Sequence, residues 1–532
     1  MKAARQFVCH PAFLVIALWL FPFVFLTYEM AAGNGRGVRW WVEQRAWQIA
    51  ARHTLEQAGM VATIAFVAGW LPGVLTGLSP RGWRWPIQAL CALPLLLPPF
   101  LWAIGWSFLQ CRAPRAWYAL FDGRWGMLCA GLAAAVPLVV LAASAAVSAV
   151  PRAQWEFCLT RCGKWRTRWV AARRAWPAAA GAAALAALLG TADAGAGQIM
   201  GWHGMAGDVL VSLATRQDLA EAATKALAGM VLLLPLAAVA AWLLVTAWAH
   251  RQTSQSVLRH GGMPDCIRLN WMPTMALALT ALIALGLPAG GLATPLSKGR
   301  GEYYLLEAFV LWKSSLGPTL WYAVGGGAVA TAGGAILAAR CAGQARWIAL
   351  FLLALAVPSS LRSLGWASAG AHWPVVRVLL SGEPGVAFVL GVQWMPLAAL
   401  LLAPAFAAVP SSWNDRRRLT GMARLPYTLR VLLPVLAPWL GIAALSCALL
   451  VLADVTSLML LQPPGRTAFT SHVFAVMDNS MEIIVASLCV ALLLMPLMLG
   501  LLLLLATTAT RWRISRFLNP LHLNAHPSLQ RP

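Results

Sequence analysis

Long apolar runs recur along the whole chain and constrain its fold more than any other feature. Each is close to the roughly 20 residues that an α-helix needs to cross the hydrocarbon core of a bilayer. The 532 residues are 60% hydrophobic and only 11% charged, which is too few charges for the surface of a water-soluble globule. We therefore predict an all-α integral membrane protein with twelve transmembrane helices, at residues 11–28, 58–78, 86–109, 125–149, 178–200, 227–249, 271–288, 316–339, 345–364, 386–408, 435–455 and 483–506.

The basic residues predict the orientation of these helices. With the N-terminus on the cytoplasmic side, the inner segments and the adjoining helix ends hold 25 of the 40 Lys and Arg residues, but three of the 17 acidic residues. Lys and Arg are enriched on the cytoplasmic side of membrane proteins. We therefore expect both termini in the cytoplasm and attribute the net charge of +23 to topology, not to nucleic-acid binding. The first run is a retained signal anchor, which we favour, or a cleaved signal peptide.

The chain repeats one pattern twice. Five marks occur in the same order in both halves: a Thr-Leu pair, the motif P-x-x-L-x-x-x-G-W, two prolines fourteen residues apart, a polar loop with a lone glycine, and an apolar run with one aspartate. They begin at Thr54, Pro98, Pro137, Gly163 and Asp193, and again at Thr319, Pro358, Pro396, Gly421 and Asp454. Six runs per copy is an even number, so the halves insert in the same orientation. We predict two parallel halves, 1–260 and 261–532, which meet in the polar stretch 250–270, and close helix packing at glycines 325–327 and 333–334.

Two polar loops, at about 150–177 and 409–434, are the longest inner connections of the two halves. Each opens with Val-Pro, carries one acidic residue, reaches a lone glycine, and ends at a proline that enters the next apolar run. A short polar segment between two membrane helices can form a small surface helix, and a glycine permits a sharp backbone turn. We predict that the two loops are cytoplasmic docking elements, one in each half.

The second loop resembles the EAA loop of bacterial ABC-importer permeases. Its sequence D-R-R-R-L-T-G-M-A-R-L-P-Y-T-L-R-V-L-L-P places Asp415 at the first position of the pattern E-A-A-x-x-x-G and Gly421 at the glycine, and the Leu-Pro pair ending at Pro434 closes it. The first loop departs from the pattern. Glu156 lies seven residues before Gly163, where six is usual, and the closing pair is Trp-Pro, one residue late.

The resemblance extends over most of the chain, to the ferric-iron and thiamine permease group of these importers. It implies a type I permease fold with two fused six-helix halves in a bacterial inner membrane, a dimer of cytoplasmic ABC ATPase subunits, and a periplasmic solute-binding protein. Residues 460–467 are similar to the outer loop of the ferric-iron branch, whereas Asp193-x-Gly195 with Gly201 is similar to the thiamine branch. Ferric iron or a thiamine-like solute is the expected cargo, and phosphonates, polyamines and sulfate stay open.

The resemblance also assigns roles to residues of the two loops. The expected ATPase-docking residues are Glu156, Gly163, Asp415, Arg416, Leu419, Gly421 and Pro434. Asp415 would pair with a basic residue of the ATPase, and Arg416, Arg417 and Arg418 with acidic ones. The alternative for the three arginines is that they only anchor the helix ends on the inner side of the membrane.

Three charged residues fall within or at the end of apolar runs: Asp193, Arg362 and Asp454. A charge at the centre of a membrane helix costs about 2.5–3.5 kcal/mol on insertion scales, so such residues usually have a functional or paired role. We predict that the two aspartates face each other across a pseudo-two-fold axis and line the translocation passage, with Arg362 as the counter-charge of Asp454. The alternative is a structural pair near the outer interface.

Other classes of function lack their sequence patterns. The one Gly-Lys pair, at Gly163, is not preceded by the glycine of a phosphate-binding loop, so ATP hydrolysis is expected from a partner. We find no catalytic or metal-ligand spacing among the scattered cysteines and histidines, and we expect no cofactor. Two rivals stay open. The first is an ion-gradient-driven twelve-helix carrier, although its usual charged signature between the second and third helices is missing. The second is a polytopic membrane enzyme, although the outer acidic residues are dispersed in the sequence.

Overall fold

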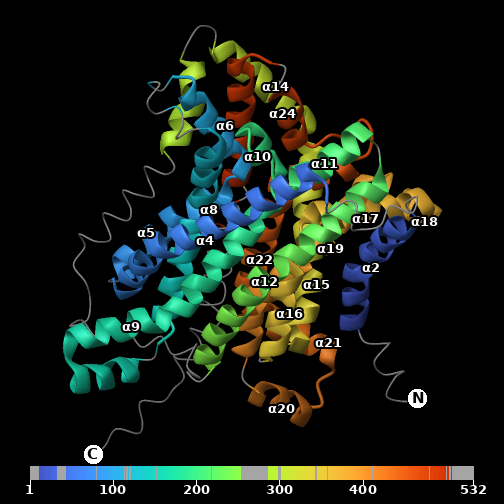
Figure 1. The fold of residues 1–532 in the computed structure, drawn as a ribbon. Coiled ribbons are helices and arrows are strands. Elements are labelled where there is room, and N and C mark those ends of the chain that lie inside the picture. Colours follow the sequence, from blue (N-terminus) through green and yellow to red (C-terminus); the bar gives the residue numbers. More distant parts are fainter. Residues whose placement is uncertain are drawn as a thin grey trace, which may run out of the picture.

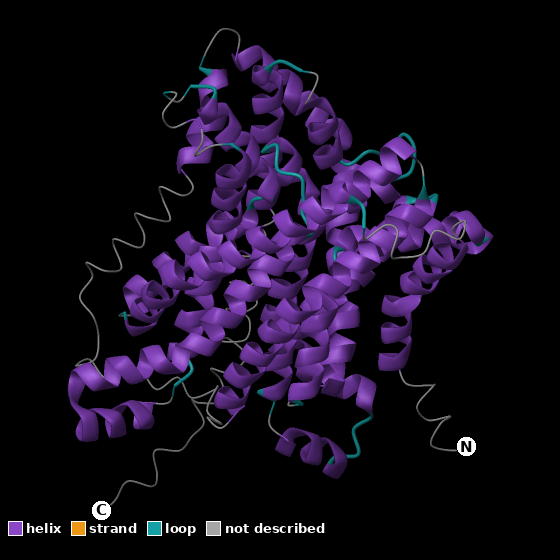
Figure 2. Cartoon of the chain, viewed as in Figure 1, coloured by secondary structure: helices purple, strands orange, loops and turns teal. Residues whose placement is uncertain are grey.

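Helices make up almost all of the computed structural model, and no strand occurs among the residues that it describes (Figure 2). The described residues are 11–32, 43–79, 81–112, 114, 118, 122–150, 152–216, 218–252, 286–297, 301–341, 344–355, 357–409, 411–477, 480–498, 500–501 and 505. The predicted all-α fold class is confirmed for this part of the chain. The predicted meeting point of the halves at 250–270 and most of the predicted helix 271–288 lie outside it.

The first half contains α2 (Pro11–Ala32), α4 (Arg45–Leu78), α5 (Arg81–Ala92), η1 (Leu93–Leu96), α6 (Pro99–Gln110), α8 (Gly123–Ser148), α9 (Arg152–Thr191), α10 (Ala194–Ile199), α11 (Met205–Arg216) and α12 (Leu219–Gln252). The second half contains α14 (Gly301–Leu320), η3 (Trp321–Gly325), α15 (Gly326–Cys341), α16 (Ala345–Leu355), α17 (Ser359–His372), α18 (Pro374–Leu380), α19 (Glu383–Ala407), α20 (Ser411–Leu419), α21 (Arg424–Tyr427), η4 (Thr428–Leu432), α22 (Leu433–Ala453), α23 (Val455–Leu461), α24 (Phe469–Met477) and the helix Glu482–Met498.

Seven helical segments of the described chain are long and apolar enough to cross a membrane, and two further bent pairs raise the number to nine. Large apolar side chains on their outer faces, such as Val67, Val231, Trp242 and Val310, are exposed. Exposed apolar patches of this extent are unfavourable in water and favourable in lipid. The helices therefore fit a multi-pass membrane protein.

Two of the predicted helices are broken in the structure. Residues 86–109 form two helices that bend by 85° between Leu95 and Pro99, and residues 345–364 form two that bend by 79° between Leu355 and Ser359. A proline in extended conformation caps the second helix of each pair, Pro98 for α6 and Pro358 for α17. Proline lacks an N–H group and disfavours the helical conformation in the residue before it, which explains why both breaks occur at the repeated P-x-x-L-x-x-x-G-W motif.

Two further predicted helices end earlier than expected. The predicted helix 178–200 stops at Thr191, and the predicted helix 435–455 stops at Ala453. In each case an aspartate follows and begins a short new helix, α10 or α23. Asp193 and Asp454 therefore lie at breaks between helices, not inside continuous ones.

Glycines allow close helix contacts in both halves. A Cβ atom added at Gly69 of α4 would lie 2.8 Å from Val139 of α8, and one added at Gly334 of α15 would lie 2.5 Å from Ala398 of α19. Gly327 likewise lies against Ala444 of α22. The predicted packing role of the glycine tract is confirmed at Gly327 and Gly334, and Gly69 makes the same kind of contact in the first half.

Helices of the two halves also pack on each other. The first-half helices α2 and α12 both contact α17 of the second half. Their apolar side chains form one cluster in which Leu26, Ala222 and Leu361 are buried. Figure 1 shows α20 at the lower end of the molecule and α14 and α24 at the opposite end, with the long helices between them.

Candidate functional site

The second polar loop begins with a short surface helix that ends in a tight turn. In α20 the side chains of Asp415 and Arg416 are exposed, and Leu419 at its end is 86% exposed. The N–H of Met422 donates to the carbonyl of Arg417, and the N–H of Gly421 donates to that of Arg418. This is the Schellman arrangement, which needs a left-handed residue at the position of the glycine.

The backbone of Gly421 has φ 63° and faces open space. A side chain at this position would meet no neighbour, so the left-handed conformation is the reason for a glycine here. The chain then passes through α21 and η4 into α22, and Pro434 is the second residue of α22 and is exposed. The loop thus joins an exposed knob directly to a membrane helix.

The first polar loop has the same break at the matching glycine. Gly163 has φ 69° and ψ 174° within α9, again with open space around its Cα atom, so a short helix from Arg152 meets a longer helix at an elbow. Glu156 is exposed on the short helix, and Trp165 and Trp169 are exposed on the longer one. Figure 1 shows the elbow of α9 and helix α20 at the same, lower end of the molecule.

At the other end of these helices, both aspartates cap short helices. Oδ1 of Asp193 accepts hydrogen bonds from the N–H groups of Gly195 and Ala196, at 2.9 and 3.3 Å. Oδ1 of Asp454 accepts one from the N–H of Ser457, at 3.1 Å. Aspartate is a favoured N-cap because its carboxylate accepts from the free N–H groups of the first helical turn. Helices α10 and α23 contact each other, so the two capped breaks lie at one junction of the halves.

A buried polar network connects Asp454 to Arg362. Oδ2 of Asp454 accepts a hydrogen bond from the Ser457 hydroxyl at 2.6 Å, and Ser457 lies 3.5 Å from Oε1 of Gln393. The Gln393 amide donates to Ser363, and its backbone carbonyl accepts from Nη1 of Arg362. The network therefore connects two of the three charged residues that the sequence singled out, and the third, Asp193, caps α10, which packs on the helix that Asp454 caps. The contacts from Arg362 to Asp454 thus run through Gln393 and Ser457, which are both uncharged.

One threonine in each half makes the same contact. The Thr54 hydroxyl accepts a hydrogen bond from the N–H of Met205, the first residue of α11, at 2.9 Å. The Thr319 hydroxyl accepts one from the N–H of Phe469, the first residue of α24, at 3.0 Å. Each threonine thus satisfies one free N–H at a helix start. These two threonines are the first residues of the two Thr-Leu pairs in the sequence repeat. The repeat is therefore also seen in individual hydrogen bonds of the structure.

A cavity of about 530 Å³ lies beside Asp193. Helices α4, α8, α9, α10 and α11 of the first half line it together with α23 and α24 of the second. Its wall includes Gln57, whose side chain is 7% exposed, and Trp202, which stacks on His53 at a ring distance of 4.0 Å. Among the described residues that line the cavity, Asp193 is the one acidic residue, and none is Lys or Arg.

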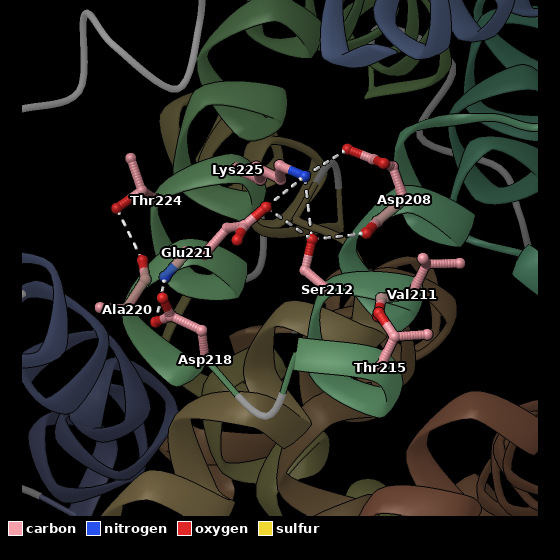
Figure 3. Close-up of polar contacts among 9 residues, drawn as sticks. All are labelled: Asp208, Val211, Ser212, Thr215, Asp218, Ala220, Glu221, Thr224 and Lys225. Atoms are coloured by element: carbon pink, nitrogen blue, oxygen red, sulfur yellow. Dashed lines mark hydrogen bonds and ion pairs between the residues drawn. The ribbon is translucent and has the colours of Figure 1, made fainter. Parts of the chain in front are cut away.

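A second buried cluster, which the sequence did not reveal, lies between α11 and α12 (Figure 3). Nζ of Lys225 is 2.8 Å from Oε1 of Glu221, 2.9 Å from Oδ2 of Asp208 and 2.9 Å from the Ser212 hydroxyl. The hydroxyl in turn donates to Glu221 at 3.2 Å. Asp208 and Glu221 belong to the outer acidic residues that are dispersed in the sequence, and the fold gathers them around one lysine.

Helix α11 separates this cluster from the cavity. Its residues Gly207 and Leu210 line the cavity, whereas Asp208 and Ser212 face α12. The cluster therefore fixes the position of one cavity wall. The spacing of Glu221 and Lys225 by four residues was the available signal, because side chains four apart lie on the same face of a helix.

Comparison of the chain with protein-family models, with curated proteins and with solved structures finds no match. The geometry described above is therefore the basis for the function proposed below. Among the described residues, no three His, Cys, Asp or Glu side chains are placed to hold one metal ion.

Proposed function

We propose that the chain is the transmembrane permease subunit of an ATP-driven importer that works by alternating access. A separate dimer of ATPase subunits binds the two docking loops on the cytoplasmic face, and a solute-binding protein delivers cargo to the opposite face. Both loops belong to one chain, so one copy serves one complex. The protein lies in a bacterial inner membrane with both termini in the cytoplasm, and its cargo is ferric iron or a thiamine-like small solute.

The observation that carries the proposal is the pair of exposed elbows at Gly163 and Gly421. Both glycines are left-handed and both face open space, and the elbow of α9 and helix α20 lie at one end of the molecule (Figure 1). At Gly421 the turn presents Leu419, an apolar side chain with 86% exposure, next to the exposed charged residues Asp415, Arg416 and Arg418 of α20. An exposed apolar anchor with a charged rim is typical of a protein-binding surface.

Each elbow is joined by one helix to a break that carries an aspartate. Helix α22 has 21 residues, about 32 Å at 1.5 Å per residue, and connects the loop of Gly421 to Asp454. Helix α9 connects the elbow at Gly163 to Asp193 in the same way. Because a helix is stiff, a displacement of either loop by an ATPase would be transmitted to the aspartate at its far end. This linkage gives alternating access a mechanical route.

Reconstitution into vesicles tests the proposal. The purified chain is inserted with and without a candidate ABC ATPase subunit and a candidate solute-binding protein, and uptake of labelled ferric citrate and thiamine is measured with ATP, without ATP, and with an imposed ion gradient. We expect uptake only with the ATPase, ATP and the binding protein. Uptake driven by an ion gradient in vesicles without the ATPase would refute the proposal and favour the secondary carrier.

A further inference from the structure

We propose that the cavity beside Asp193 is the site of the transported solute, and that it binds a small organic cation with N–H donors and an apolar body. That the bound molecule is transported rests on the proposed function, because a site between the two halves can release its ligand on the other side of the membrane only if the halves move. Binding itself can be tested on the isolated chain.

Four buried polar atoms at this cavity find no partner in the protein. They are Oε1 and Nε2 of Gln57, Oδ2 of Asp193 and Nε1 of Trp202. An unsatisfied buried polar group costs about 1–3 kcal/mol. The protein itself provides no partner for these four atoms, so a ligand that pairs with them supplies hydrogen bonds that the fold leaves unmade.

The second half shows that the fold does not require these unpaired atoms. Three residues after its repeat threonine, where the first half has Gln57, it has Tyr322, whose hydroxyl donates to the carbonyl of Arg466 at 2.9 Å. Where the first half has Asp193, it has Asp454, both of whose oxygens accept hydrogen bonds from Ser457.

The halves also differ at the residue that follows Gly201 in the first half and Gly465 in the second, two glycines with a left-handed backbone. It is Trp202 in the first half and Arg466 in the second, and Arg466 forms an ion pair with Glu383 at 3.5 Å. All three equivalents in the second half are thus satisfied within the protein. At these three positions the unpaired groups occur in the first copy alone, which is expected for a binding site and not for a structural requirement.

The chemistry of the cavity selects the class of ligand. Oδ2 of Asp193 and Oε1 of Gln57 are acceptors, and no Lys or Arg among the described lining residues balances the carboxylate. Met459, Leu460 and Phe474 provide an apolar wall. A volume of about 530 Å³ is within the usual range for small-molecule pockets. One carboxylate with apolar walls suits an ammonium or amidinium group on an apolar body better than a bare metal ion.

Calorimetry on the full chain in lipid nanodiscs tests the inference. The probes are 2-phenylethylammonium, benzamidinium and tryptammonium, each with a neutral and an anionic analogue of the same shape. We expect at least one cation to bind and its analogues to bind about tenfold more weakly or not at all. Asp193→Asn keeps Oδ1 as the cap of α10 but replaces Oδ2 by an amide, and should weaken cation binding about tenfold or more.

Gln57→Leu separates a binding role from a structural one. Because it removes two unpaired buried atoms, we expect the empty protein to be as stable as the wild type or more stable, with cation affinity reduced about tenfold. Tyr322→Phe at the equivalent position of the second half is the matched control and should leave the affinity unchanged.

Several results would overturn the inference: no cation binds at millimolar concentration, the neutral analogues bind equally well, or Gln57→Leu destabilises the empty protein because waters already satisfy the amide. ATP-driven uptake in vesicles together with any of these results would leave the proposed function standing. Cation binding without ATP-driven uptake would refute the proposed function and leave the site standing.

Discussion

Replacing Lys225 by methionine removes the cation that holds the carboxylates of Asp208 and Glu221 together. The lysine is 3% exposed, Glu221 is 1% exposed and Asp208 is 18% exposed. At 2.8 Å and an effective dielectric constant of about 20, one ion pair contributes roughly 6 kcal/mol of Coulomb energy, most of which is offset by desolvation. Methionine has a similar length but no charge, so it keeps the packing and leaves the buried Glu221 without the positive charge of Lys225.

We expect Lys225→Met to lower the free energy of unfolding by about 3–5 kcal/mol, the cost of removing one partner from a buried ion pair. The double variant Lys225→Met/Glu221→Gln should recover at least about 2 kcal/mol, because glutamine is neutral and still accepts the hydrogen bond from Ser212.

Unfolding in mixed detergent micelles, followed by circular dichroism, measures both values. A loss below about 1 kcal/mol in the single variant would show that the charges are not coupled as the distances imply. A double variant as unstable as the single one would show that packing of the lysine, not its charge, matters.

Two further predictions concern the helix contacts and the repeat. Gly334→Ala would place a Cβ atom 2.5 Å from that of Ala398, so it should destabilise the protein by about 2 kcal/mol or more in the same assay, whereas Gly317→Ala, with no atom within 4 Å, should not. Thr319→Val leaves the N–H of Phe469 without its acceptor and should cost about 1–3 kcal/mol, and a change below about 0.5 kcal/mol would contradict the assigned hydrogen bond.

The sequence predicted the features that depend on local pattern. Apolar runs give helices of membrane length, and the isolated glycines of the polar loops mark sharp turns, as Gly163 and Gly421 show. The repeat found from short motifs corresponds to repeated structure at the two proline breaks, the two aspartate caps and the two threonines. Each of these features requires one residue type at one place in the backbone, so the amino-acid pattern retains it.

The remaining features depend on contacts between segments that are distant in the sequence. A proline in an apolar run can either kink a helix or break it. The breaks of about 80° before α6 and α17 depend on how these helices pack against the rest of the protein, which the local sequence does not encode. The cavity at Asp193 needs α23 and α24 of the other half to close it. The unpaired state of Gln57 is equally invisible in the sequence, because an identical glutamine with a neighbouring donor would be a satisfied core residue.

The coupling role of the second loop is tested most directly at Gly421. A β-branched residue in the left-handed conformation is strained by about 1–2 kcal/mol or more, so Gly421→Val should distort the turn without a clash, because no atom lies within 4 Å. Gly465→Val is the matched control, since Gly465 has φ 76°, is equally open, and lies beyond the far end of α22.

The measurement is the ratio of solute taken up to ATP hydrolysed in vesicles that contain the chain, the ATPase and the binding protein. The account predicts that Gly421→Val lowers this ratio strongly while Gly465→Val keeps it near the wild-type value. Equal ratios for the two variants, or full coupling in Gly421→Val, would contradict the role of the loop as the contact through which the ATPase drives transport.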